Sequence, residues 1–138
     1  MTNPTGPEQQ RKMHILFIAG NPAFRPVVTR FLGKCDELNV VDILPASEKV
    51  LAQAQDLQPQ VILLDLDTSD PTGLETIINL RTSLPEVGII ALSLLDGDGY
   101  RQAVLAAGAN ELILKSNLST DLFPAIRRAA RNGREGPE

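Results

Sequence analysis

Five short apolar runs alternate along the chain with five amphipathic segments, and this alternation limits the fold more than any other feature. The runs are His14–Ala19, Asn39–Leu44, Val61–Asp65, Gly88–Ser93 and Glu111–Leu114. The third run has four consecutive apolar residues, which is typical of a strand buried on both faces of a parallel sheet. Strands that alternate with helices imply right-handed crossovers and helices on both faces of that sheet. We therefore predict an α/β fold, a flavodoxin-like (βα)5 three-layer sandwich with strand order 2-1-3-4-5.

The segments between these runs have the spacing and the end signals of helices. Their apolar residues are Phe24, Val27, Val28, Phe31 and Leu32, then Val50, Leu51, Ala54 and Leu57, then Leu74, Ile77, Ile78 and Leu84, then Tyr100, Ala103, Val104 and Ala107, and finally Leu122, Phe123, Ile126 and Ala130. Gly33 is placed to end the first helix, and Ser47 is a good N-cap for the second. Ser119 or Thr120 can cap the last helix, which would place Pro124 in its first turn, where proline is tolerated.

The length and the ends of the chain indicate one domain. A chain of 138 residues suits a single hydrophobic core. The first twelve residues are polar and include two prolines, so we expect a disordered lead-in over 1–12. We predict the domain itself over 13–131 and a flexible tail over 132–138.

Composition excludes several classes of protein. A net charge of −4 argues against general nucleic-acid binding, which depends on clustered Lys and Arg. Cys35 is the only cysteine, so the chain has no intramolecular disulfide and no multi-cysteine metal site, as suits a reducing compartment. No apolar run approaches the roughly eighteen residues of a membrane span, and no signal-peptide pattern is present. We expect a cytoplasmic protein that binds neither membrane nor nucleic acid directly.

Polar and small residues gather where the predicted strands end. In open α/β sheets the ligand crevice lies at the carboxyl ends of the strands. Ala19 and Gly20 follow the first strand, Asp65 ends the third, Ser93 ends the fourth, and Lys115 follows the fifth. We therefore expect these residues to converge on one crevice.

Several stretches occur in the order in which they occur in one known family. They are Asn21-Pro22-Ala23-Phe24-Arg25, Val61-Ile62-Leu63-Leu64-Asp65, Gly73-Leu74-Glu75, Ser93, and the run from Gly108 to Ser116. Together they resemble the response-regulator receiver domain, over roughly residues 13–131, and the last run is similar to receivers that precede a helix-turn-helix effector. The resemblance implies that Asp65 corresponds to the phosphoacceptor, Ser93 to the hydroxyl that follows the phosphoryl group, and Lys115 to the ammonium that pairs with it.

The chain departs from that family in parts that matter for phosphorylation. Family members carry two acidic residues that hold Mg²⁺, where this chain has Ala19 and Gly20. Without those carboxylates a hard cation lacks oxygen ligands, and the phosphoryl charge is less well neutralised. We therefore predict no cofactor, unless Asp67 or Asp70 supplies an oxygen for Mg²⁺. Leu112 occupies the position of the family's aromatic switch residue.

We accordingly predict an atypical receiver in signal transduction that acts by protein-protein interaction or dimerisation, with impaired or absent Mg²⁺-dependent phosphorylation. By analogy with the family's output surface, the interaction face comprises the fourth helix, fifth strand and fifth helix. Its candidate residues are Tyr100, Leu105, Glu111, Leu112 and Arg127. The partners that the resemblance implies are a second copy of the chain, a sensor histidine kinase or an effector domain.

Other interpretations remain open at this point. Asp65 is a working phosphoacceptor if Asp67 or Asp70 recruits Mg²⁺. Alternatively, Asp65 and Lys115 form a permanent ion pair that needs no phosphate. A small-ligand or anion sensor is a third reading, because Ala19 and Gly20 leave the crevice roomier and less acidic. We do not predict an enzyme, because the first loop is not a phosphate-cradling glycine loop and no nucleophile-base pair is evident.

Overall fold

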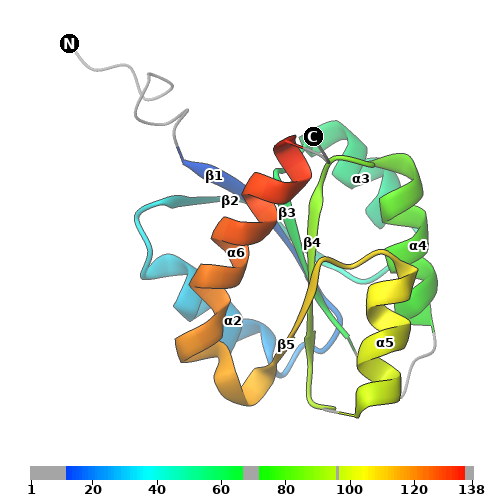
Figure 1. The fold of residues 1–138 in the computed structure, drawn as a ribbon. Helices are drawn as coiled ribbons and strands as arrows, with labels where there is room; N and C mark the ends of the chain where they lie inside the picture. The colour runs from blue at the N-terminus through cyan, green and yellow to red at the C-terminus, as the bar shows by residue number, and fades with distance from the viewer. Residues whose placement is uncertain (1–11, 67–71, 96, 136–138) are drawn as a thin grey trace.

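One five-stranded parallel sheet forms the centre of the molecule (Figure 1). The computed structural model describes residues 12–66, 72–95 and 97–135. The strands are β1 (Met13–Ala19), β2 (Leu38–Pro45), β3 (Val61–Asp65), β4 (Gly88–Ser93) and β5 (Glu111–Leu114). The helices are α2 (Arg25–Gly33), α3 (Val50–Leu57), α4 (Thr72–Ser83), α5 (Asp98–Ala107) and α6 (Leu118–Glu135), with a short 3-10 helix η1 (Lys115–Asn117). The strand order is β2-β1-β3-β4-β5, which confirms the predicted fold.

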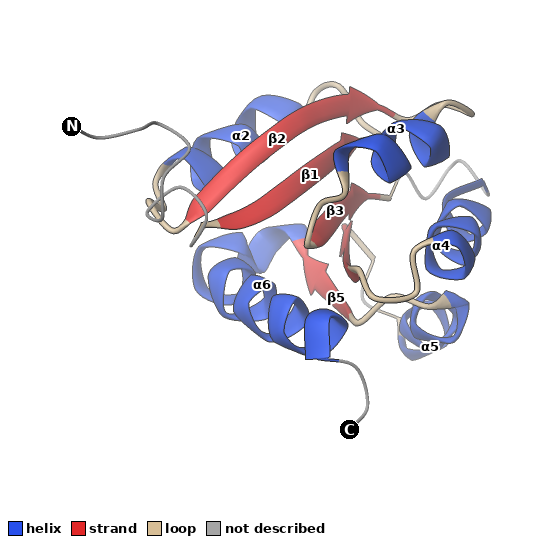
Figure 2. Cartoon of the chain, turned by 90° about the horizontal axis from the view of Figure 1, so that it is seen from above, coloured by secondary structure: helices blue, strands red, loops and turns tan. Residues whose placement is uncertain are grey.

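The helices cover the sheet in two layers. Helices α2 and α6 lie on one face, and α3, α4 and α5 lie on the other (Figure 2). Every residue of β3 is buried, because this strand is central and both of its faces are covered. The carboxyl ends of all five strands point the same way, toward the lower edge of Figure 1.

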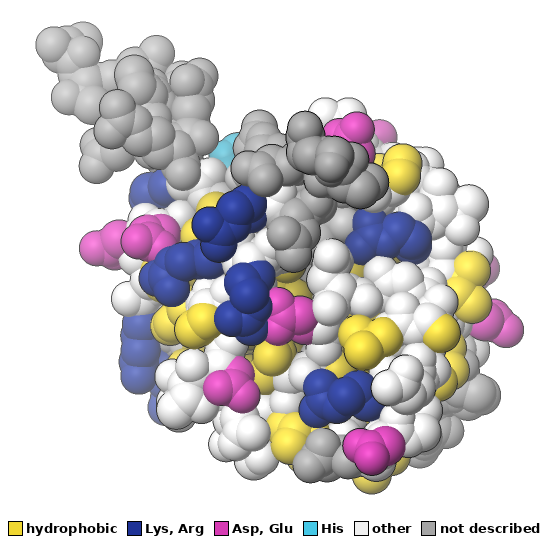
Figure 3. All heavy atoms as spheres, in the orientation of Figure 1, with side chains coloured by type: hydrophobic (Ala, Val, Ile, Leu, Met, Phe, Trp, Pro, Cys, Tyr) yellow, Lys and Arg dark blue, Asp and Glu magenta, His cyan; other side chains and the backbone are white. Residues whose placement is uncertain are grey.

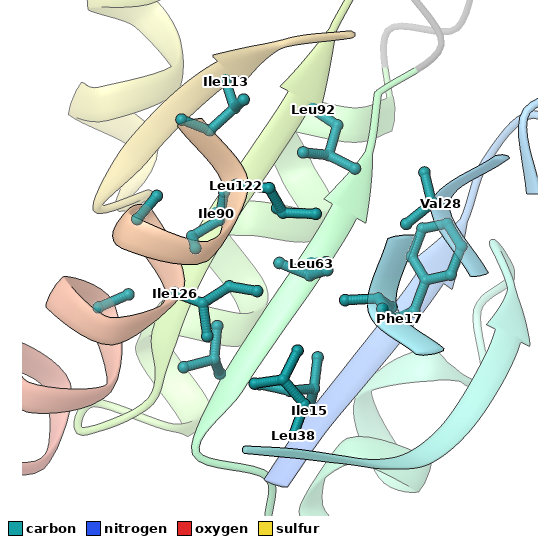
Figure 4. Close-up of a cluster of buried hydrophobic side chains, with 14 of the residues drawn as sticks. Ile15, Phe17, Val28, Leu38, Leu63, Ile90, Leu92, Ile113, Leu122 and Ile126 are labelled. Atoms are coloured by element: carbon teal, nitrogen blue, oxygen red, sulfur yellow. The ribbon is translucent and has the colours of Figure 1, made fainter. Parts of the chain in front are cut away.

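The buried side chains of the core on the α2 and α6 face are aliphatic apart from Phe17 (Figure 4). Phe17 of β1 and Leu63 of β3 face α2 and α6, and Leu122 and Ile126 of α6 belong to the same buried cluster. All four side chains are fully buried. Burial of each such side chain stabilises the fold by about 1.5–3 kcal/mol.

The core on the other face of the sheet forms because side chains alternate between the two faces along each strand. Residues next to those of the first core point to the other face, so Leu16 and Ile62 pack under α3, α4 and α5. The fully buried helical members of this cluster are Ala54 of α3, Ile77 and Leu80 of α4, and Val104 of α5.

Two features, one on each face of the sheet, hold the helices close to it. A Cβ atom at Gly88 would lie 2.7 Å from the carbonyl oxygen of Ala129, so the absence of a side chain lets α6 approach β4. On the other face, the Arg81 guanidinium donates hydrogen bonds to the Gly108 and Val87 carbonyl oxygens and to Asn110 Oδ1. Burial lowers the pKa of Arg81.

The structure corrects several helix predictions. Helix α3 begins at Val50 rather than directly after Ser47, whose hydroxyl instead accepts the Lys49 N–H at 3.1 Å. Neither Ser119 nor Thr120 caps α6, because that helix continues directly from η1 and begins at Leu118.

The earlier start of α6 places Pro124 in the second turn and not in the first. Pro124 is exposed, so water can satisfy the carbonyl group that its missing N–H would have bonded. The helix also continues through Glu135, so the boundary of the tail predicted at residue 132 is wrong. The residues from 136 on, and the lead-in over 1–11, lie outside the described residues.

Two residues of the predicted apolar faces are exposed. Val27 on α2 is 40% exposed and Ile78 on α4 is 48% exposed. Each sits at the edge of its helical stripe, beside residues that are fully buried, Val28 and Ile77. None of the described helices has the length and hydropathy that a membrane span requires.

Candidate functional site

The predicted site lies at the carboxyl ends of β1, β3, β4 and β5, and Asp65 ends β3, the central strand of the sheet. Asp65 is the last residue of β3 and only 2% of its surface is exposed. Lys115 follows the last residue of β5 and is likewise buried. Parallel β3 and β5 flank β4, so their ends bring the two side chains together as the sequence predicts.

Asp65 and Lys115 form a buried ion pair. Lys115 Nζ is 2.5 Å from Asp65 Oδ1. Among the described residues, Oδ1 is contacted by this ammonium and accepts no hydrogen bond of regular geometry. The other carboxylate oxygen, Oδ2, accepts the backbone N–H of Asn21 at 3.0 Å. Both oxygens of Asp65 are therefore engaged by groups of the chain itself.

A tight turn after β1 supplies the Asn21 contact. Asn21 Oδ1 accepts the Ala23 N–H at 3.0 Å, and the Asn21 carbonyl accepts the Phe24 N–H, also at 3.0 Å. This Asx-type turn is what an Asn-Pro sequence favours. Its last residue, Phe24, lies with its ring centroid 4.5 Å from Lys115 Nζ. The ammonium thus contacts a carboxylate and the face of an aromatic ring.

The Ser93 hydroxyl is used within its own loop. Ser93 is fully buried, and its Oγ accepts the Leu95 N–H at 2.9 Å and lies 3.3 Å from the Leu95 carbonyl oxygen, to which it donates. Tyr100, in the first turns of α5, is a further partner. Burial raises the pKa of Tyr100, and a hydrogen bond with Ser93 opposes that rise.

The described residues do not fit the magnesium site that the resemblance implies. Ala19 and Gly20 carry no ligand oxygen in their side chains, and the two oxygens of Asp65 are engaged. Within residues 12–66, 72–95 and 97–135, no three Asp, Glu, His or Cys side chains are grouped closely enough to hold a metal ion. Asp67 and Asp70, the predicted substitutes, lie outside the described residues.

The predicted interaction face is only partly exposed as expected. Tyr100 and Leu105 of α5 and Glu111 of β5 are half-buried. Leu112 is 4% exposed and packs in the core under α4 and α5, so its inclusion in a surface is wrong.

Arg127 is also misplaced in the predicted face, because it does not lie beside β5. Its Nε donates to Glu37, just before β2, at 3.1 Å, so Arg127 points to the opposite edge of α6. The neighbouring Arg128 makes the contact with β5 instead. Its Nε and Nη2 donate to the two carboxylate oxygens of Glu111 at 2.7 and 2.6 Å, and this contact raises the pKa of Arg128.

Basic side chains gather over α6 in Figure 3, with acidic ones set between them. The ion pairs Arg127–Glu37 and Arg128–Glu111 explain this mixed pattern. The face is therefore a network of surface pairs rather than a uniformly basic patch.

Sequence reasoning missed the parts that Asn21 and Phe24 play at the site. Both were noticed as members of a family-like stretch, but neither was given a role. The Asn-Pro pair signals a turn, whereas no sequence signal reveals that the ring of Phe24 reaches a lysine that is distant in the chain. Arg128 was likewise missed, because the rotation of α6 about its axis decides which of two adjacent arginines reaches Glu111.

Comparison with known proteins gives a consistent result. A family model described as the response regulator receiver domain matches residues 15–127. The response regulator protein VraR of Staphylococcus aureus is 26% identical over 117 residues, which cover 85% of this chain and 56% of VraR. This chain therefore spans little more than half the length of that relative.

Solved structures show the same fold. The response regulator domain of CheB from Thermotoga maritima aligns with a TM-score of 0.77 at 21% identity, over 88% of this chain and 98% of that one. A two-component response regulator of the LuxR family from Aurantimonas sp. SI85-9A1 aligns with a TM-score of 0.79 at 20% identity, over 89% and 87% of the two chains. The family match over most of the chain, together with this fold and the placement of Asp65 and Lys115, shows that the chain belongs to the response regulator receiver domains of two-component signalling.

Proposed function

We propose that this domain is an atypical receiver that acts by protein-protein contact, without Mg²⁺-dependent phosphorylation of Asp65. One observation carries the proposal. The buried carboxylate of Asp65 is held by Lys115 and by the Asn21 N–H, on the side where the family's acidic pair is replaced by Ala19 and Gly20.

The chemistry of phosphoryl transfer explains why this arrangement opposes it. The attacking oxygen must reach the phosphorus in line with the leaving group, and charge on three phosphoryl oxygens must be neutralised. The side chain of Asp65 is 0% exposed. Lys115 is the one cation in contact with it among the described residues, and that charge is already paired. Transfer would therefore require the pair to open without the oxygen ligands that normally offset this charge.

A working phosphoacceptor is the second candidate, and it also has an observation in its favour. Asp65, Ser93 and Lys115 stand at the ends of three neighbouring strands, in the arrangement that the family resemblance implies. This alternative requires Asp67 or Asp70 to supply oxygen ligands.

An anion sensor at the crevice has less support. Lys115, the cation that such a ligand would need, is paired with Asp65 and covered by Phe24. A surface hollow of about 350 Å³ lies between α3 and α4, and its lining includes Glu48 and Glu75 but neither Asp65 nor Lys115. Two carboxylates disfavour an anionic ligand there.

Intact-mass spectrometry after incubation with acetyl phosphate and Mg²⁺ tests the proposal. The expected result is no adduct on the folded wild-type domain, under conditions in which a receiver that carries the acidic pair is labelled. Asp65→Asn serves as the control for the site of any adduct. One phosphoryl group on the wild type that is lost in Asp65→Asn would overturn the proposal and establish the phosphoacceptor alternative.

Restoring the acidic pair sharpens this test. The double variant Ala19→Asp, Gly20→Asp supplies carboxylate oxygens at the end of β1, where Mg²⁺ needs them. We expect it to take up more phosphoryl label than the wild type. If the double variant and the wild type are labelled equally well, then the loss of the acidic pair does not set the reactivity of Asp65.

The proposed contact surface consists of α5, β5 and the Arg128 side of α6. Leu105 and Glu111 are two of its half-buried residues. The partner that binds this surface is a second copy of the chain, a histidine kinase or an effector domain. Glu111→Arg reverses a charge on this surface and replaces the attraction to Arg128 by repulsion. It is therefore expected to weaken self-association measured by sedimentation velocity. Arg127→Glu is the matched control, since Arg127 points to the other edge of α6. Equal effects of the two variants would contradict the placement of the surface.

A further inference from the structure

The turn between β1 and α2 closes the Asp65 site with two separate contacts. The Asn21 N–H reaches Asp65 Oδ2 at 3.0 Å, and the Phe24 ring lies 4.5 Å from Lys115 Nζ. In this family the same segment follows the acidic pair. Here it contacts both members of the ion pair.

Phe24 is held in place by backbone hydrogen bonds on both sides. Its N–H donates to the Asn21 carbonyl at 3.0 Å, and its own carbonyl accepts the N–H groups of Val27 and Val28 at 3.2 and 3.3 Å. Phe24 also packs against the core on the α2 and α6 face. A ring fixed in this way keeps its position over the ammonium without a large further loss of side-chain entropy.

The contact of the ring with Lys115 has a definite chemical consequence. The ring face attracts the ammonium and keeps water from it, and the side chain of Lys115 is 3% exposed. In such surroundings the attraction between Lys115 and Asp65 is stronger than it is in water. An approaching anionic phosphodonor would have to displace the ring to reach the side of the ammonium that the ring contacts.

We infer that the segment Asn21–Phe24 is a built-in latch, and that Phe24 is the positioning residue that keeps the Asp65–Lys115 pair closed. This inference rests on the proposed function, because it treats the pair as standing without a phosphoryl group. It goes further in naming the element that maintains the closed state. Opening of this turn, and not the arrival of a phosphoryl group, is then the event that changes the crevice.

Competitive acylation of lysine amines reads out the latch directly. Trace acetic anhydride is added to the folded domain, and labelling at each lysine is followed by peptide mass spectrometry. Lys34 and Lys49 are exposed and serve as internal references, whereas Lys115 is buried. In the wild type we expect Lys115 to be labelled far more slowly than either reference.

Two substitutions at Phe24 separate the ring from mere apolar volume. Phe24→Leu keeps an apolar side chain but removes the ring face, and labelling of Lys115 should become about tenfold faster, as expected for loss of a desolvated cation–π contact. Phe24→Tyr keeps the ring, so Lys115 should stay protected. Val27→Ala removes an exposed apolar side chain from the same helix and should leave Lys115 unchanged. Lys34 and Lys49 should be labelled at wild-type rates in all three variants.

Two outcomes would overturn the latch. One is wild-type protection of Lys115 in Phe24→Leu. The other is faster labelling in Phe24→Leu together with faster amide hydrogen exchange throughout β3, because the ring would then serve the whole fold and not the site.

The latch and the proposed function fail separately. Phosphorylation of wild-type Asp65 would overturn the proposed function whatever the lysine labelling shows. Unchanged protection of Lys115 in Phe24→Leu, with no phosphorylation of the wild type, would overturn the latch alone.

Discussion

Two ion pairs of almost equal length lie at opposite ends of β5, and they differ in their surroundings. Lys115 Nζ is 2.5 Å from Asp65 Oδ1, with side chains 3% and 0% exposed. Arg128 Nη2 is 2.6 Å from Glu111 Oε1, with side chains 51% and 23% exposed. The first pair is enclosed by the ends of the strands and a phenylalanine ring, whereas water surrounds much of the second. Distance alone therefore does not predict what either pair does for the protein.

The comparison shows that burial decides how much stability is lost when one partner of an ion pair is removed. A buried charge that loses its counter-charge has no water to replace it, so removing one partner is severe. An exposed pair exchanges its contact for solvation, and salt screens its attraction. The Asp65–Lys115 pair is consequently suited to hold the crevice in one state, and the Glu111–Arg128 pair is suited to a surface that a partner can rearrange.

The largest expected effect is that of Lys115→Met. Methionine preserves much of the length and apolar character of the lysine stem but leaves the buried Asp65 carboxylate without a counter-charge. We expect the free energy of unfolding in urea, followed by circular dichroism, to fall by about 3–5 kcal/mol at neutral pH. Arg128→Met is the matched change in the exposed pair and should lower stability much less. Equal losses in the two variants would contradict the comparison.

The second variant removes both charges of the buried pair. Asp65→Asn combined with Lys115→Met leaves no uncompensated charge, so most of the stability lost in Lys115→Met should return. The Asn21 N–H can still donate to the side-chain oxygen at position 65. The measurement is the same urea unfolding, analysed as a double-mutant cycle. No recovery would show that the packing of Lys115 under Phe24, and not burial of charge, dominates.

Salt should separate the two pairs with a smaller effect. At about 1 M salt the Debye length is about 3 Å, so attraction between exposed charges is largely screened. The stability difference between the wild type and Arg128→Met should shrink toward zero, while that between the wild type and Lys115→Met persists. Urea unfolding at low and high NaCl concentration measures both. A salt-sensitive difference for Lys115→Met would mean that solvent reaches the crevice.

The smallest effect concerns Tyr100, whose burial lies between these extremes. Burial raises the pKa of Tyr100 above its ordinary value of 10.0, and the hydrogen bond with Ser93 opposes the rise. Because the folded pKa is the higher one, the contribution of Tyr100 to stability is complete below pH 10 and is lost as pH rises through the folded pKa. Tyr100 is the only tyrosine, and the chain has no tryptophan, so tyrosinate absorbance reports on this residue alone.

Ser93→Ala provides the control for that titration. It removes the hydrogen bond that lowers the pKa, so the midpoint should move further upward. A midpoint that falls in Ser93→Ala would contradict the assigned contact between Ser93 and Tyr100, and a wild-type midpoint at or below 10 would contradict the rise that burial causes.

Sequence patterns predicted most of the framework. All five strands were placed to within a residue or two of their observed bounds, because apolar runs bounded by Gly and Pro have few other solutions. The convergence of Asp65 and Lys115 followed from the parallel topology, since the strands that carry them flank one neighbour.

Rotations of helices were predicted less well. Val27 and Ile78 continue the apolar stripes of α2 and α4 but are exposed, because the sheet covers less than the whole stripe. Arg127 and Arg128 are equivalent in sequence terms. Which one meets Glu111 depends on how α6 is turned against β4, and the absence of a side chain at Gly88 lets that helix approach closely.

By itself, then, the amino-acid sequence determined the order and type of the elements, the parallel sheet, and the retention of Asp65 and Lys115 beside a missing acidic pair. These features depend on local periodicity and on residue identity, which are present in the chain before it folds. Only the tertiary structure decided that the Asn21 N–H and the Phe24 ring close the site. Both contacts join residues far apart in the chain, so their existence depends on the exact packing of a turn against two strand ends, which no local pattern encodes.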